Sequence, residues 1–171
     1  VVRVKYLNSV IFFCLTLALN VLPAQALDTH KEDTRSLSHY IAAVYSEGLG
    51  DLEGAIGEYQ KALETDPGSS LVHLNLASVF IQKDNSAQAV EELKQSIQLA
   101  PETVEPHALL ALVYGAQNKL DLAAEEYILA FQNATKLEPE NIDIYKGLGA
   151  IYLQEKKLKQ AEGIFKLIVK L

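Results

Sequence analysis

The amino-acid sequence predicts an all-α fold, a solenoid of four stacked helical hairpins, and two observations carry this prediction. First, the chain repeats itself every 34 residues, so that Glu64-Thr65-Asp66-Pro67 aligns with Gln98-Leu99-Ala100-Pro101. Self-similarity at this period is typical of stacked helix pairs. Second, small and large side chains recur in fixed columns, which are Ala43, Ala77, Ala111; Ala55, Ala89, Ala123; and Tyr59, Leu93, Tyr127, Phe165. Two helices approach closely where large groups face small ones.

The turn residues divide each interval into two helices. We expect first helices over residues 37–48, 71–82, 105–116 and 142–154, and second helices over 52–65, 87–99, 120–137 and 158–170. The segments between them, Gly48-Leu49-Gly50-Asp51, Lys83-Asp84-Asn85 and Gln117-Asn118-Lys119, contain residues that tolerate left-handed backbone. Pro67, Pro101 and Pro139 follow the second helices, where a proline restricts the residue before it and ends a helix.

These columns resemble the tetratricopeptide repeat, and the resemblance covers residues 36–171. In the first interval the matching residues are His39, Ala42, Ala43, Ser46, Ala55, Tyr59, Ala62 and Pro67. The resemblance implies a right-handed superhelix of four repeats, 36–69, 70–103, 104–141 and 142–171. Pro139 comes four residues late, which one extra helical turn near Gln132 to Thr135 would explain.

The fourth repeat stops at Leu171, inside its second helix, and no polar capping helix follows. Repeat arrays normally need a terminal element with a polar outer face. The sequence is therefore either a fragment, or its end is a contact surface through which the chain associates with itself.

Residues 1–26 are typical of a secretory signal peptide. Arg3 and Lys5 precede an apolar run over residues 10–19, and Ala24-Gln25-Ala26 offers small residues at the cleavage spacing. An uncleaved membrane anchor is the alternative, but a span needs about 20 apolar residues. We expect an exported protein of the periplasm or cell envelope that contacts the membrane only through this signal peptide. Polar residues 27–35 form a linker.

Composition and motifs argue against several functions. The formal net charge of -7 opposes nucleic-acid binding, and the single cysteine, Cys14, lies in the apolar run. The segment from Gly48 to Gly54 resembles a phosphate loop only superficially, because Glu53 stands at the third glycine position. No Walker, HExxH or GxSxG motif occurs. We therefore expect no enzyme activity and no cofactor.

His39, His73 and His107 fall in one column, which suggests a metal site or a packing column. Equivalent positions in successive hairpins lie about 8 to 10 Å apart, whereas zinc needs each nitrogen at about 2.1 Å. One ion cannot bridge them, so we interpret the column as packing.

The resemblance also implies a concave groove that the first helices line. The candidate partner-binding residues are Tyr40, Val44, Glu47, Leu71, Leu74, Ser78, Ile81, Gln82, Glu105, Ala108, Leu112, Lys146 and Leu153. Some family members clamp a C-terminal carboxylate; the matching residues here are Tyr40, Val44, Asn75, Glu105 and Leu109, and only Asn75 agrees. We expect instead a protein or peptide partner with apolar side chains, as an amphipathic helix or an extended segment.

The functional hypothesis is a protein–protein interaction scaffold or adaptor in the bacterial cell envelope. The alternative is the N-terminal interaction region of a longer exported enzyme or secretion component. Some groove residues could also pack against an additional helix beyond this sequence.

Overall fold

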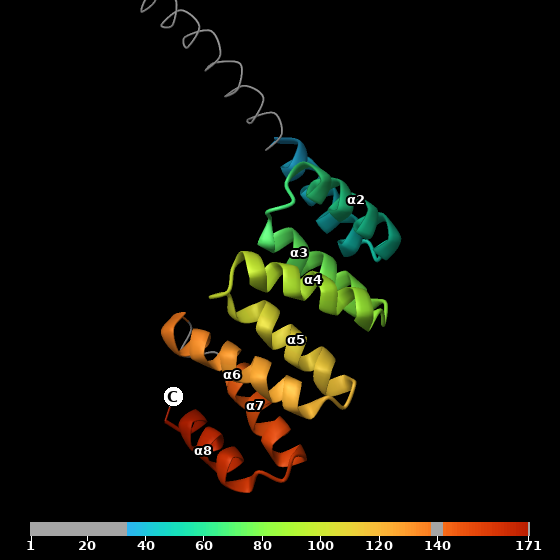
Figure 1. Ribbon diagram of the computed structural model, residues 1–171. Coiled ribbons are helices and arrows are strands. Elements are labelled where there is room, and N and C mark those ends of the chain that lie inside the picture. The colour runs from blue at the N-terminus through green and yellow to red at the C-terminus, as the bar shows by residue number, and fades with distance from the viewer. Residues whose placement is uncertain (1–33, 138–141, 171) are drawn as a thin grey trace, which may run out of the picture.

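The computed structural model describes residues 34–137 and 142–170, and within these ranges all regular structure is helical. A first helix covers residues 34–48. It is followed by α2 (Leu52–Thr65), α3 (Ser70–Gln82), α4 (Ser86–Leu99), α5 (Val104–Ala116), α6 (Leu120–Leu137), α7 (Ile142–Gln154) and α8 (Leu158–Ile168). Figure 1 shows the helices stacked as hairpins in chain order. This arrangement confirms the all-α solenoid; the predicted signal peptide lies outside the described residues.

The helix boundaries differ slightly from those expected. Residues 34 and 35, assigned to the linker, are already helical, and α8 ends at Ile168, two residues early. Helices α3, α4 and α5 each begin one residue earlier than expected. Polar N-caps explain two of these starts, because the Ser69 and Asn85 side chains accept hydrogen bonds from the backbone N–H groups of Val72 and Gln88.

Every hairpin turns through a left-handed residue at the same place in the repeat. Gly50, Asp84, Asn118 and Lys156 have φ values of 78°, 57°, 57° and 60°. The residue after each donates its N–H back into the preceding helix, for example from Asn85 to the Phe80 carbonyl oxygen at 2.8 Å. This pattern is a Schellman-type helix end. It agrees with the expected turns, and it shows that Gly48 to Gly54 is a turn plus a helix start.

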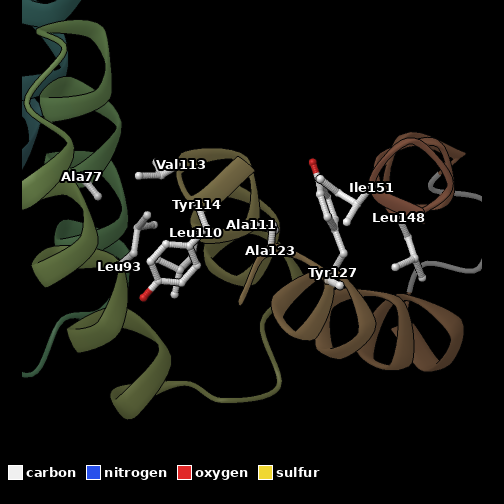
Figure 2. Packing of buried hydrophobic residues seen from close by; sticks show 11 residues of the cluster. Ala77, Leu93, Leu110, Ala111, Val113, Tyr114, Ala123, Tyr127, Leu148 and Ile151 are labelled. Atoms are coloured by element: carbon white, nitrogen blue, oxygen red, sulfur yellow. The ribbon is translucent and has the colours of Figure 1, made fainter. Parts of the chain in front are cut away.

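The alanine columns form the seams between helices. All six alanines of the two columns are fully buried, and Tyr59, Leu93 and Tyr127 are buried beside them, whereas Phe165 is partly exposed. Figure 2 shows the central cluster, in which Leu93, Tyr114 and Tyr127 fill the space between successive hairpins. Large groups therefore pack over small ones along the stack.

The extra helical turn predicted in the third repeat is present. Helix α6 has 18 residues, whereas α2 and α4 have 14 each. The added turn buries Ala134 in a cluster with Val104, Ile144 and Tyr145, and the Asn133 amide donates to the Pro101 carbonyl oxygen at 3.0 Å. The insertion thus extends the contact between neighbouring hairpins.

Among the residues described, none of the helices is both long enough and apolar enough to cross a membrane.

Candidate partner-binding groove

Two adjoining cavities form a groove along the first helices of the later repeats. The α3–α5 cavity has a volume of about 280 Å³, and the α5–α7 cavity has about 400 Å³. Leu112 and Ala116 of α5 line both cavities, so we treat them as one surface, the central groove. Its α3–α5 part is lined by Ile81, Asp84, Ser86, Leu109, Leu112, Val113 and Ala116. Its α5–α7 part is lined by Ala111, Leu112, Gly115, Ala116, Tyr127, Lys146, Gly147, Ala150, Ile151 and Gln154.

Three of the residues chosen from the sequence lie in the central groove, namely Ile81, Leu112 and Lys146. Tyr40 and Leu71 instead line a separate cavity of about 230 Å³ between the first helix and α3. The remaining exposed candidates, Val44, Gln82, Glu105 and Leu153, line none of these three cavities. Five of the predicted residues therefore line one of these three cavities.

Other candidates are engaged within the protein. Leu74 and Ala108 are partly buried and pack against the core clusters. The Ser78 hydroxyl donates to the Leu74 carbonyl oxygen of its own helix at 3.1 Å. These three side chains are therefore less accessible to a partner than their positions in the sequence suggest.

Glu47 and Gln82 join in a polar cluster between the first two repeats. The Tyr59 hydroxyl donates to Glu47 Oε2 at 3.1 Å, and the Gln82 amide donates to Glu47 Oε1 at 2.6 Å. Burial, and then the charge of Glu47, raise the pKa of Tyr59, so its hydroxyl stays protonated. Both oxygens of this carboxylate already accept hydrogen bonds.

The histidine column pairs with a column of glutamates. The Nδ1 atoms of His39, His73 and His107 lie 2.7, 2.6 and 2.7 Å from Oε2 of Glu58, Glu92 and Glu126. Each pair joins the first helix of a hairpin to its second helix. The packing interpretation of the histidines is incomplete, because it missed these partners. The glutamates also recur every 34 residues, so the same self-alignment could have found them.

In the fourth repeat the equivalent residues are Tyr145 and Ile164, and they belong to one apolar cluster. The residues at these two positions therefore match in every repeat. They form a polar pair in repeats one to three and an apolar contact in repeat four. Within residues 34–137 and 142–170, no three His, Cys, Asp or Glu side chains are grouped to hold a metal ion.

The groove carries little charge. Lys146 is the basic residue among those that line the α5–α7 cavity, and its ammonium lies 3.1 Å from Asp143 Oδ1 in an exposed pair. Exposed pairs of this kind contribute little, so Lys146 remains available to a ligand. The rest of that cavity's wall is apolar apart from Tyr127 and Gln154. Sequence reasoning treated Tyr127 only as a core residue and missed it as part of the groove.

The stacked hairpins and the groove along their first helices define an α-helical repeat protein of the binding-scaffold class. Residues 48–113 match the family model described as tetratricopeptide repeat. This match identifies tetratricopeptide repeats in residues 48–113. The repeat columns and the hairpins on either side follow the same pattern, so the chain has the fold of that family.

A curated relative is the type IV pilus assembly protein PilF of Pseudomonas aeruginosa, which is 26% identical over 105 residues. The matched region covers 60% of this chain and 40% of PilF, so the chain spans less than half of that relative. A solved structure of PilF superposes with a TM-score of 0.71 at 25% identity, covering 82% of this chain and 62% of PilF.

Two further solved structures share the fold. A crystal structure of MamA gives a TM-score of 0.72 at 22% identity, covering 82% of this chain and 80% of MamA. The first tetratricopeptide domain of Spaghetti (RPAP3), solved with an HSP90 peptide, gives 0.67 at 19% identity, covering 72% and 95%.

Proposed function

We propose that the protein is an exported adaptor of the bacterial cell envelope, which holds a partner protein's apolar side chains in the central groove. The tetratricopeptide fold supports a protein–protein interaction scaffold. The observation that carries the proposal is Leu112, an exposed leucine that lies between two adjoining cavities on one face of the stack.

Exposed apolar side chains along the first helices support this use of the surface. Val44, Leu71, Leu112 and Leu153 are all exposed, and each belongs to the first helix of a different repeat. Leaving such groups in water is unfavourable, and a partner that covers them removes that cost. A helix or an extended segment with apolar side chains at regular spacing fits a surface of this kind. We propose no catalytic role, since tetratricopeptide repeats generally form non-catalytic scaffolds.

The envelope location is supported by the signal-like residues 1–26 and by similarity to a protein named for type IV pilus assembly. Fusing residues 1–26 to alkaline phosphatase, which is active only after export, tests this part. We expect phosphatase activity in a bacterial host, and loss of that activity when residues 10–19 are deleted. Equal activity with and without the apolar run would contradict export by this segment.

Site-specific photocrosslinking tests the groove. A photoreactive amino acid at position 112 should crosslink a partner in cells, whereas the same group at position 129 should not. Leu129 is a suitable control because it is an exposed leucine on the second helix α6 that lines none of the described cavities. Crosslinks from 129 but none from 112 would show that the partner binds a different face.

A further inference from the structure

Two columns of the repeat match each other in polarity, with one exception. The first column is Glu47, Ile81, Gly115 and Leu153, and the second, twelve residues further on, is Tyr59, Leu93, Tyr127 and Phe165. Repeat one pairs a carboxylate with a hydroxyl, and repeats two and four pair apolar with apolar. Repeat three sets the hydroxyl of Tyr127 against a glycine. The acceptor present in repeat one is missing there.

Tyr127 is only 5% exposed and lines the α5–α7 cavity. Figure 2 shows its hydroxyl oxygen beside Ile151, on the side turned away from its own helix. Among the residues that the structure describes, the Tyr127 hydroxyl has no hydrogen-bond partner. Leaving such a group without a partner costs free energy once a ligand displaces the remaining water. The cavity therefore presents a hydroxyl donor that has no acceptor within the described part of the protein.

The side chains around Tyr127 correspond to those of the polar cluster that Glu47 forms with Tyr59 and Gln82 in the first two repeats. In repeat one Glu47 accepts from Tyr59 and from Gln82 of the next repeat. Gln154 stands in the column of Gln82, one repeat after Tyr127, and lines the α5–α7 cavity. Gly115 lines the same cavity in place of the glutamate. The two donors of this arrangement are kept, and the carboxylate between them is absent.

We propose that the α5–α7 cavity binds a glutamate side chain of the partner segment, whose carboxylate takes the place that Glu47 occupies in the first repeat. The Tyr127 hydroxyl and the Gln154 amide donate to that carboxylate, and Lys146 attracts its charge. A glutamate side chain fits better than a chain terminus, because Glu47 makes the same contacts with a side chain. Burial raises the pKa of Tyr127, which keeps the donor protonated.

The apolar wall of the cavity defines what lies beside the glutamate. Leu112 and Ile151 line the cavity with Ala150, so side chains that flank the glutamate should be apolar. The overall negative charge of the protein opposes a strongly acidic segment. A single glutamate between leucines is therefore the preferred ligand, and this inference rests on the proposed role of the groove in binding a partner.

The test uses a peptide with both ends blocked, in which one glutamate is flanked by leucines. NMR titration of the whole chain should shift the amide resonances of Gly115 and Gly147. Replacing the peptide's glutamate with glutamine should weaken binding about tenfold or more, since hydrogen bonds to a charged group are the stronger ones. The glutamine peptide with a free C-terminal carboxylate should stay equally weak.

Variants of the protein test whether the preference for glutamate arises in the α5–α7 cavity. Tyr127→Phe keeps the ring and removes the donor, so it should abolish most of the preference for glutamate. Tyr59→Phe, the matched change in the first repeat, should leave that preference intact. Gly115→Glu supplies an internal carboxylate and should block the glutamate peptide, whereas Gly115→Gln should block it less.

Equal binding of the glutamate and glutamine peptides, no binding of either, or a preference that survives Tyr127→Phe would overturn the inference. Equal binding at the groove resonances would leave the proposed function standing. That function fails separately, if position 112 gives no crosslinked partner. Tight binding of the free C-terminal carboxylate would overturn the choice of a side chain.

Discussion

At the scale of single residues, the three histidines show how one contact is reused at different depths. The exposed fraction of the side chain falls from 27% in His39 to 13% in His73 and 5% in His107, although each bonds a glutamate. The same replacement should therefore cost more stability further along the chain. Removing one partner of a buried hydrogen bond costs about 1–3 kcal/mol.

We expect the alanine substitutions His39→Ala, His73→Ala and His107→Ala to lower the free energy of unfolding in increasing order. His107→Ala should reach about 1–3 kcal/mol. Urea unfolding followed by circular dichroism measures the series. Equal losses, or the largest loss at His39, would mean that burial does not set the strength of these pairs.

The carboxylate of Glu58 makes stability depend on pH. Hydrogen bonds from Lys61 and then His39 lower the pKa of Glu58 below its ordinary value of 4.5. Because the folded-state pKa is the lower one, the stabilisation is fully present above the unfolded-state pKa and is lost as the pH falls through the folded-state pKa. Glu58→Gln should destabilise the protein at neutral pH, and the difference should shrink in acid below the ordinary pKa. A difference that stays constant between neutral pH and strong acid would refute this assignment.

Gly147 is a glycine because Tyr127 lies against it. A Cβ atom at Gly147 would be 2.5 Å from two carbons of the Tyr127 ring, and the ring is buried, so something must shift. We expect Gly147→Ala to destabilise the protein by about 1–3 kcal/mol.

Gly57→Ala is the matched control, since a Cβ there meets nothing within 4 Å. It should stabilise the helix by about 0.5–1 kcal/mol through reduced backbone freedom. Thermal unfolding measures the stability of the two variants. A neutral or stabilising Gly147→Ala would show that the Tyr127 ring moves at little cost.

At the scale of elements, the sequence placed the helices well because their ends carry local signals. Polar N-caps and turn residues recur at a fixed spacing. Each helix boundary therefore has an equivalent in the other repeats, and the equivalent boundaries support one another. Lys156 is the exception, because it turns left-handed at a φ of 60° with no residue type to announce it. Only its alignment with Gly50, Asp84 and Asn118 identifies the position.

Lys156→Gly should therefore stabilise the fourth hairpin. A left-handed conformation costs a non-glycine residue about 1–2 kcal/mol, and Gly50 already occupies the equivalent position in the first hairpin. We expect a gain of about 1 kcal/mol, partly offset by the greater freedom of glycine in the unfolded chain. The reverse change, Gly50→Ala, should lose a similar amount in the same melting experiment. A gain in both variants would exclude backbone strain as the cause.

At the scale of the whole molecule, the period of the sequence determines the solenoid, but it does not determine which part of the inner face is open. Leu74 and Ser78 fit the family's groove positions, yet the first packs into the core and the second bonds its own helix. Tyr127 comes from a second helix and reaches the groove because Gly147 leaves room for it. Whether a groove position is open depends on the sizes of side chains that meet from neighbouring repeats. The alignment of repeats with one another does not reveal these sizes in combination.

The proposed function requires that the face formed by the first helices binds the partner. The most direct measurement compares the affinities of Leu112→Glu and Leu129→Glu for the partner captured by crosslinking, using isothermal titration calorimetry. Both leucines are exposed, by 56% and 43%, so neither substitution buries a charge in the free protein. We predict that Leu112→Glu weakens binding by about tenfold or more, while Leu129→Glu changes it by less than about twofold. Undiminished affinity of Leu112→Glu, with a loss in Leu129→Glu, would show that the partner does not bind the face formed by the first helices.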